Sequence, residues 1–307
     1  MNDLFETLLD KLELQMRFSG KREGSIADYK SIIRRYLEYL LVYCGITDPK
    51  EATYIDMKGF IGFLQYGDGK GNGGTCKGNA LNQAVTKLGF FQEHVLLMDF
   101  DRREFPKIKF DKYIPYIPER DFVLKFIDTI EDLEVKAYLS LLYSAALRNN
   151  EVRFLKCGDI EKSRNRIKVS ESKNREQRYA YLSDKTYKIL KEYVRTVLIP
   201  KGLSSSDLYL FPSKRKSTCR EKPVSSSWIN GRIKKHEKEL NLEHKITTHT
   251  FRRACACHMA EARPDDPRML FIIADFLGHK SLESTRHYLH MGNVYNGSPF
   301  FFSPFDL

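Results

Sequence analysis

The sequence contains no long hydrophobic run. A membrane-spanning helix needs roughly 18 consecutive apolar residues, and no segment of the 307-residue chain approaches that length without charged residues. The first residues, MNDLFETLLDKLE, are acidic and amphipathic, and they lack the basic start and the cleavage site of a secretory signal. We therefore expect a soluble, cytoplasmic protein with no membrane partner.

Paired cysteine motifs are also lacking. None of the six cysteines forms a C-x-x-C pair, so we expect reduced and mostly buried thiols. Cys255, Cys257 and His258 lie close together in the sequence, but a second ligand pair at zinc-site spacing is missing. The sequence therefore predicts no metal site and no cofactor.

Positive charge, by contrast, is abundant and unevenly distributed. The chain has 51 Lys and Arg against 40 Asp and Glu, a net charge of +11. Residues 1–112 contain 17 basic and 16 acidic residues, so almost all of the excess lies in residues 113–307. A basic half favours a polyanionic partner, nucleic acid first, although a solvated basic surface would have the same composition.

The first hundred residues have helical periodicity. Leu4, Leu8 and Leu12 recur at four-residue intervals, and Ser25 with Asp28 resembles a capping box at the start of a second helix. We expect a helical domain over residues 1–100. A proline-punctuated, basic stretch follows and predicts an extended linker over 101–118.

The second half predicts a mixed domain over residues 119–291. IKVS and RYAYLS are β-branched or alternating around a polar loop, which predicts a β-hairpin near 166–183. The fold class expected is mainly α with a small β-hairpin, that is α+β. Residues 292–307 are aromatic and proline-rich, and we expect them to pack as a tail. The helices of this half are predicted over 119–130, 133–146, 184–198, about 226–240, 249–262 and 267–276.

Four separated segments of this half carry chemistry. They are ALRNNEVRFLKCGD (146–159), the hairpin tip SKNREQR (172–178), HTFR (249–252), and LGH (277–279) followed by a tyrosine at position 288. Two arginines can clamp one phosphate with planar donors. Histidine can transfer protons near neutral pH, and tyrosine can act as a covalent nucleophile when cations stabilise its phenolate. No carboxylate cluster for a divalent metal accompanies them, so the implied reaction is metal-free attack on a phosphodiester.

The same segments resemble the tyrosine recombinase (site-specific integrase, Xer-like) family. Leu-Arg-x-x-Glu followed by Leu-Lys-x-x-Asp resembles the family's first box. His-x-x-Arg, then Leu-Gly-His and a tyrosine nine residues later, resembles the second. The resemblance covers about 119–291 and, more loosely, residues 1–100, which are similar to the family's core-binding domain. The order of the four motifs makes the resemblance specific.

The resemblance implies a role for each motif residue. Arg148 and Arg252 would hold the scissile phosphate, and Glu151 would support Arg148. His279 would donate a further hydrogen bond to the phosphate, and Tyr288 would form a 3′-phosphotyrosine. The general acid for the departing 5′-hydroxyl would be Lys173, and the general base would be His249.

Alternatives remain open at four of these positions. Lys168 could replace Lys173, and Tyr295 competes with Tyr288. His249 could be only a helix-start residue, and His279 only a helix C-cap. The chain also departs from the family pattern: Ala146 stands where glycine is usual, Arg253 where histidine is usual, and Glu171-Ser172 replaces a glycine-rich approach to the hairpin tip.

The function expected is that of a site-specific DNA recombinase or integrase that cleaves and rejoins strands without a metal. A type IB topoisomerase-like enzyme and a catalytically idle DNA-binding protein are the alternatives. The partner expected is double-stranded DNA, on which the chain, a monomer in solution, would form a homo-tetramer. The tail would dock on a neighbouring protomer or on the protomer to which it belongs. The expected location is the nucleoid in the cytoplasm. The expected DNA contacts are Arg102, Arg103, Lys107, Lys109, Arg175, Arg178, Arg232, Lys234 and Lys235.

Overall fold

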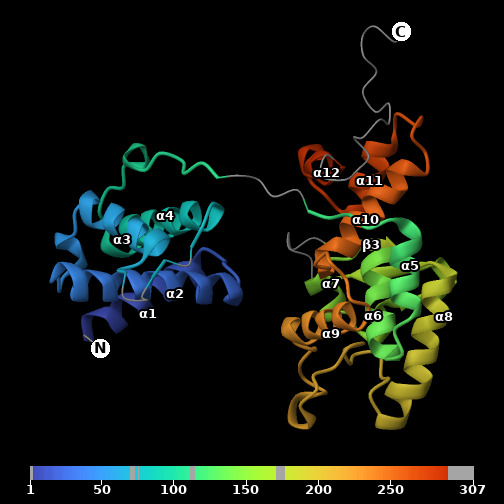
Figure 1. Cartoon of the computed structure of the whole chain (residues 1–307). Helices are drawn as coiled ribbons and strands as arrows, with labels where there is room; N and C mark the ends of the chain where they lie inside the picture. Colours follow the sequence, from blue (N-terminus) through green and yellow to red (C-terminus); the bar gives the residue numbers. More distant parts are fainter. Residues whose placement is uncertain (1–2, 70–72, 75, 111–114, 171–176, 290–307) are drawn as a thin grey trace, which may run out of the picture. The chain divides into compact units, whose positions relative to one another are not determined.

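The computed structural model describes residues 3–69, 73–74, 76–110, 115–170 and 177–289. They belong to two compact units, Met1–Tyr113 and Ile114–Leu307 (Figure 1). The described chain is mainly helical with one small antiparallel sheet, which confirms the predicted fold class. None of its helices is long and apolar enough to cross a membrane.

Helices make up the first unit. Each helix has an apolar face that packs inward. Leu8 and Leu12 on that face of the first helix are buried, whereas Leu4, near the N-terminus of the helix, is 39% exposed. The second and fourth helices each continue into a wider π-helical turn, Leu40–Cys44 and Gln92–Leu96. The helices are α1 (Asp3–Phe18), α2 (Glu23–Tyr39), α3 (Tyr54–Tyr66) and α4 (Asn79–Phe91).

The predicted start of the second helix is wrong. α2 begins at Glu23, so Ser25 and Asp28 lie inside it and form no capping box. Asp28 makes a different contact: its Oδ2 pairs with Nζ of Lys87 on α4 at 2.7 Å, and the Lys87 side chain is only 8% exposed. A carboxylate that the local pattern assigns to a cap is used here to join two helices.

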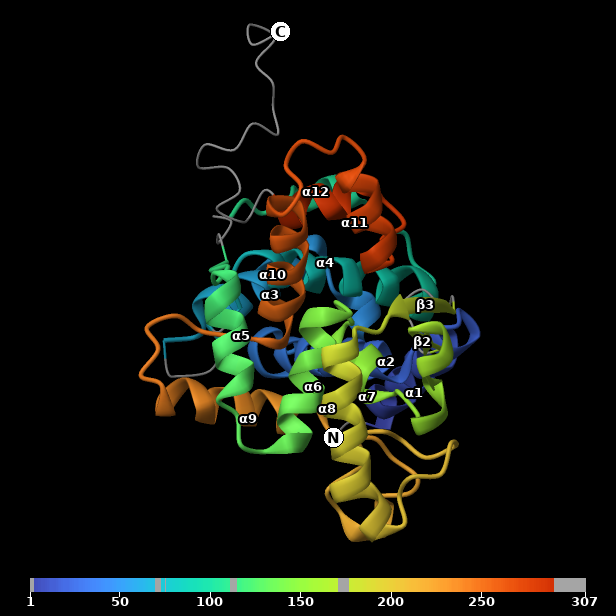
Figure 2. The same cartoon turned by 90° about the vertical axis from the view of Figure 1, so that its right-hand side faces the viewer.

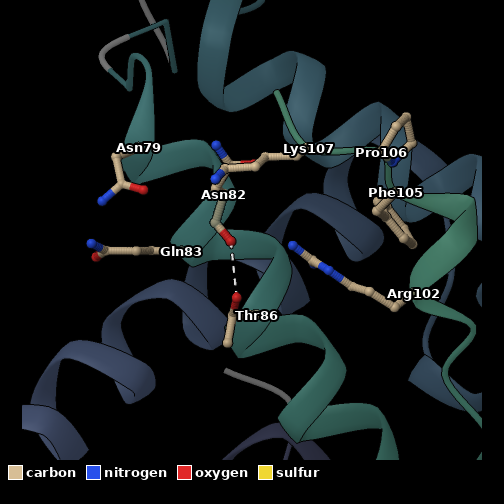
Figure 3. A pocket seen from close by; sticks show the side chains of 8 residues that line it. All are labelled: Asn79, Asn82, Gln83, Thr86, Arg102, Phe105, Pro106 and Lys107. Atoms are coloured by element: carbon tan, nitrogen blue, oxygen red, sulfur yellow. Dashed lines mark hydrogen bonds between the residues drawn. The ribbon is translucent and has the colours of Figure 1, made fainter. Parts of the chain in front are cut away.

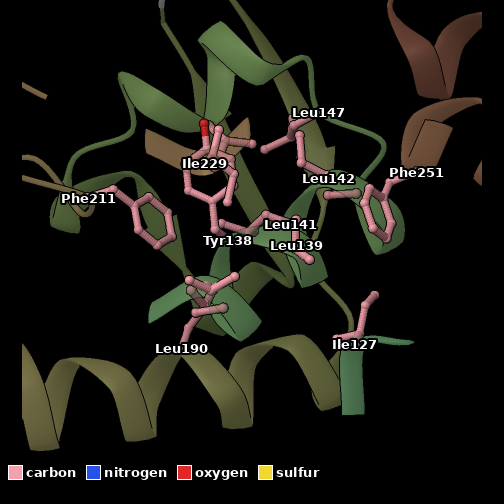
Figure 4. Close-up of a cluster of buried hydrophobic side chains, with 14 of the residues drawn as sticks. Ile127, Tyr138, Leu139, Leu141, Leu142, Leu147, Leu190, Phe211, Ile229 and Phe251 are labelled. Carbon is pink, nitrogen blue, oxygen red and sulfur yellow. The ribbon is translucent and has the colours of Figure 1, made fainter. Parts of the chain in front are cut away.

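The second unit is built around α6, which packs against α8 and α10. Its core contains apolar side chains from helices, strands and connecting segments, including Tyr138, Leu142 and Phe251 (Figure 4). The helices predicted from periodicity are present, while α7 and α12 are additional. The helices are α5 (Arg120–Asp128), α6 (Leu133–Ser144), α7 (Asn149–Arg153), α8 (Asp184–Tyr193), α9 (Ser226–Glu239), α10 (Thr248–Glu261), α11 (Met269–Leu277) and α12 (Leu282–Leu289).

The predicted hairpin is confirmed and belongs to a three-stranded antiparallel sheet. Strands β2 (Arg166–Val169) and β3 (Arg178–Tyr181) lie side by side (Figure 2), and the short β1 (Ile160–Glu161) adds to β2. Opposed residues share a face of a sheet. Val169 is buried and opposes Arg178, so Arg178 lies on the inner face, whereas Lys168 opposes the exposed Tyr179 on the other face.

Candidate active site

A buried carboxylate, Glu151, organises the site. It stands on α7, three residues after Arg148, and its side chain is 1% exposed. Its Oε1 accepts a hydrogen bond from Nη1 of Arg148 at 2.7 Å, and its Oε2 accepts one from the Arg148 backbone N–H at 2.8 Å. In the Leu-Arg-x-x-Glu motif the glutamate therefore caps the N-terminus of α7 and, at the same time, holds the guanidinium of Arg148 in place.

Arg252 reaches the same place from the first turns of α10. Its Nη1 donates to the carbonyl of Ala146, its Nη2 donates to the carbonyl of Leu277 at 2.6 Å, and Nη1 lies 3.9 Å from Oε2 of Glu151. Burial, together with the nearby charge of Arg148, lowers the pKa of Arg252 to about 10, so the guanidinium remains charged at neutral pH. Arg252 thus joins three segments that are far apart in sequence.

The Leu-Gly-His motif ends α11. Gly278 has a φ of 64°, the left-handed conformation of a helix C-cap glycine, and its carbonyl accepts a hydrogen bond from Nη2 of Arg148 at 3.2 Å. His279 follows, with Nε2 3.3 Å from Nη2 of Arg252 and Nδ1 2.9 Å from Oγ1 of Thr285. Because a guanidinium only donates, Nε2 is the acceptor and Nδ1 carries the proton.

The charge state of His279 follows from its neighbours. Burial, then the positive charges of Arg252, Arg148 and Arg178, lower its pKa to about 4, while Glu151 acts in the opposite direction. The imidazole is therefore neutral at pH 7 in the DNA-free protein.

Tyr288 lies on α12 beside these groups. Its ring packs edge-on against His279, with the ring centroids 5.1 Å apart, and the guanidinium carbon of Arg253 lies 5.6 Å from the Tyr288 centroid. Sγ of Cys257 lies 3.8 Å from the Tyr288 carbonyl oxygen. The Tyr288 ring thus lies between His279, which contacts Arg252, and the partly buried Arg253, so positive charge is near the residue that would act as the nucleophile.

The structure places the proton-transfer candidates unequally. His249 is exposed in the first turn of α10, three residues before the buried Arg252. Lys173 and Arg175 lie outside the described residues. Lys168, the alternative to Lys173, lies on the outer face of β2, away from the inner face that carries Arg178. The described sheet therefore gives Lys168 no place beside Glu151.

Arg178 was expected only as a DNA contact, but it lies with Arg148 and Arg252 in the group of charged residues around Glu151, the Glu151 cluster. Its Nη2 donates to Oε2 of Glu151 at 2.9 Å, and its side chain is 16% exposed. Burial lowers its pKa, while Glu151 raises it. The signal for this placement was the strand alternation, because Arg178 shares a face with the apolar Ala180.

The other expected DNA contacts within the described chain are exposed. Arg103 forms an ion pair with Asp101 at 2.8 Å, and on α9 Arg232 lies 3.7 Å from Asp132. The exposed cations are Arg102, Arg103, Lys107 and Lys109 in the first unit, and Arg232, Lys234 and Lys235 in the second.

Two of these cations line a pocket of about 470 Å³ in the first unit (Figure 3). Arg102 and Lys107 meet the polar face of α4 there, where Asn79 and Gln83 are exposed. Asn82 holds the following segment by two hydrogen bonds to the backbone of Ile108, at 2.9 and 3.0 Å. The pocket therefore combines amide and cationic side chains on a fixed frame.

Comparison with known proteins identifies the class. The model of the phage integrase family matches residues 119–293. An integrase/recombinase of Sinorhizobium fredii is 31% identical over 214 residues, 69% of this chain and 65% of that protein. A tyrosine recombinase of Thermosipho africanus is 25% identical over 302 residues, 95% of this chain and 96% of its own.

Solved structures agree on the fold. Lambda integrase residues 75–356 bound to DNA has a TM-score of 0.66 at 14% identity, with 97% of this chain and 99% of that chain covered. The architecture and the sequence match define a tyrosine recombinase, a class of enzymes that cleave and rejoin DNA strands at specific sites. The chain belongs to the phage integrase family.

Proposed function

We propose that this chain recombines specific DNA sites through a 3′-phosphotyrosine on Tyr288, without a metal ion. The observation that carries the proposal is the Glu151 cluster, in which the guanidinium groups of Arg148 and Arg252 lie beside His279, which in turn packs on Tyr288. Two guanidinium groups supply the positive charge that a phosphoryl-transfer site otherwise takes from metal ions.

In the proposed cleavage step, Oη of Tyr288 attacks the scissile phosphorus and the bond from phosphorus to the 5′-oxygen breaks. His249 takes the phenol proton, and Lys173 gives a proton to the departing 5′-hydroxyl. Arg148 and Arg252 hold the non-bridging oxygens. The reverse step, attack by a 5′-hydroxyl on the phosphotyrosine, rejoins a strand.

His279 has a conditional part in this scheme. In the DNA-free structure its Nε2 accepts from Arg252 and carries no proton. A bound phosphate brings negative charge, which favours the imidazolium. We propose that His279 then donates from Nε2 to a phosphate oxygen while Nδ1 stays on Thr285.

The proposed partner is double-stranded DNA, bound by both units. Arg102, Arg103, Lys107 and Lys109 would contact phosphates beside the α4 pocket, where Asn79 and Gln83 present amides suited to base edges. Arg232, Lys234 and Lys235 would do so from α9. The solved lambda integrase structures of similar fold hold DNA, one of them as a dimer on a core site.

Assembly belongs to the same proposal. We propose a monomer in solution, a tetramer on two DNA sites, and the nucleoid as the cellular location. The tail, residues 292–307, would dock on a neighbouring protomer; it lies outside the described residues, as do Lys173 and Arg175.

A two-substrate assay tests the proposed function. Given two cognate sites, the protein should exchange the flanking DNA, whereas Tyr288→Phe should bind the sites equally and exchange nothing. Relaxation of a supercoiled plasmid without exchange between sites would indicate the topoisomerase-like alternative. Tight binding with neither activity would indicate an idle DNA-binding protein.

A further inference from the structure

Arg178 is held in the active site with most of its donors unused. Nη2 donates to Glu151, but Nε and Nη1 are buried and have no hydrogen-bond partner within the described chain. Buried donors without acceptors cost free energy. An arginine kept in this state by one carboxylate indicates that its charge, rather than a complete set of hydrogen bonds, is what the site uses.

The surrounding backbone is shaped to admit this side chain. A Cβ atom on Gly278 would lie 2.6 Å from Nε of Arg178 and 2.7 Å from its Cδ. Arg178 therefore passes directly over the glycine whose carbonyl accepts from Arg148. The Gly278 turn thus packs between two arginines, Arg148 on its carbonyl and Arg178 against its α-carbon.

Glu151 is the point at which the arginines compete. Its Oε2 accepts from Arg178 at 2.9 Å and lies 3.9 Å from Nη1 of Arg252. Without Arg178, Oε2 would keep only the Arg148 backbone N–H at 2.8 Å as a donor, and the buried carboxylate would attract the guanidinium of Arg252 away from its present position. Arg178 therefore prevents Glu151 from drawing Arg252 out of this position.

The charge balance points the same way. The three arginines Arg148, Arg178 and Arg252 with Glu151 amount to two net positive charges, before any charge that His279 gains when phosphate binds. A phosphodiester carries one negative charge, and attack by a phenolate makes the pentacoordinate transition state carry two. Removing Arg178 takes away one positive charge whatever the charge on His279, and this loss matters more for a transition state with two negative charges than for a ground state with one.

We propose that Arg178 is a positioning residue for strand cleavage, which neutralises Glu151 so that Arg148 and Arg252 act on the transition state with their full charge. This inference rests on the proposed function, because it assigns Arg178 a part in the Tyr288 reaction. It goes beyond a role in general DNA affinity.

Variants of the full-length protein that remove or keep the charge at positions 178 and 151 test this inference. Single-turnover adduct formation on a nicked duplex is measured for the wild type, R178Q, R178K, E151Q and the double variant E151Q/R178Q, with DNA affinity and thermal unfolding in parallel. R166Q is the matched control, because Arg166 is a sheet arginine whose Nε pairs with Glu161 at 2.7 Å, outside the cluster.

We expect R178Q to slow cleavage about 10–100-fold with little change in DNA affinity, less than the roughly 100–1,000-fold loss for a donor that touches the reacting group, because Arg178 acts through Glu151. R178K keeps the charge and should lose less than R178Q, and R166Q should match the wild type. E151Q/R178Q restores two net positive charges, so it should cleave faster than R178Q and close to E151Q.

Two results would overturn the inference: an R178Q rate like that of the wild type, or a double variant as slow as R178Q and far slower than E151Q. If R178Q does not fold, the comparison of E151Q with E151Q/R178Q decides alone. Equal rates support action through Glu151, and a further large loss contradicts it. A wild type that forms no adduct would instead reject the proposed function.

Discussion

At the residue scale, the site depends on one buried carboxylate and on the charged groups around it. Glu151 is 2% exposed and faces three arginines, while His279 is kept neutral beside them. A lone buried carboxylate would be strongly unfavourable, but here each oxygen accepts from a guanidinium. The same cations that stabilise the carboxylate make protonation of the histidine unfavourable.

His279 should therefore make the folded protein sensitive to mild acid. Its pKa is lowered to about 4 in the folded chain, against about 6.5 in an unfolded one. Between these values the unfolded state binds a proton that the folded state does not, so stability is complete above pH 6.5 and falls as the pH drops toward 4.

Urea midpoints at pH 7.5 and 5.0 measure this effect. His279→Gln should show a smaller drop between the two pH values than the wild type, because the group that titrates is gone. His258, whose pKa is also lowered by burial, is kept in both proteins and cancels in the comparison. An equal drop in both proteins would show that His279 is not the titrating group.

At the element scale, the site residues lie on short segments of four elements. These are the start of α7, the first turns of α10, the end of α11 and strand β3. Gly278 is the junction at which α11 ends, with a φ of 64° that L-residues rarely adopt. The glycine of the Leu-Gly-His motif is therefore required twice, by the backbone conformation and by the Arg178 side chain.

Gly278→Ala should destabilise the protein by about 1–2 kcal/mol through the left-handed backbone alone. It should also displace Arg178, so cleavage should slow by more than the change in stability explains. Gly231→Ala on α9 is the matched control, since no atom of the described residues beyond the adjoining backbone lies within 4 Å of the added Cβ, and it should be neutral or slightly stabilising. Urea unfolding checks the first effect, and single-turnover cleavage of folded protein checks the second. A Gly278→Ala protein with unchanged stability and rate would contradict this account of the turn.

The elements were predicted from the sequence where one periodicity dominates. The longer helices of the second unit and the β2–β3 hairpin are confirmed, because burial of one face leaves a clear pattern. The five-residue α7 has no such pattern and depends on Glu151 capping its own start. At Ser25 and Asp28 the local capping pattern was overridden by a tertiary ion pair with Lys87.

The same limit applies to the site. The resemblance of the motifs to the family predicted Arg148, Glu151, Arg252, His279 and Tyr288 as site residues, and the structure brings these residues together. The place of Arg178 was missed, because its pairing with Glu151 joins residues 27 apart in sequence through the register of a sheet. Sequence spacing reports neighbours on one element, and this contact lies between two.

At the scale of the whole molecule, the net charge is distributed unequally between the two structural units. The first unit is nearly neutral, and the second carries almost all of the net charge of +11. The second unit also holds the Glu151 cluster, whose net positive charge is buried and fixed rather than spread over the surface. General attraction to a polyanion and stabilisation of one phosphate therefore have separate structural origins within the same unit.

The most direct test of the central claim is the identity of the residue that becomes joined to DNA. A nicked suicide duplex should trap wild-type protein as a covalent adduct in the presence of EDTA, and the tryptic peptide that carries the nucleotide should contain Tyr288. Tyr288→Phe should bind the duplex normally and trap nothing, whereas Tyr295→Phe should trap as well as the wild type. An adduct that persists in Tyr288→Phe and disappears in Tyr295→Phe, or cleavage that requires added magnesium, would contradict the account.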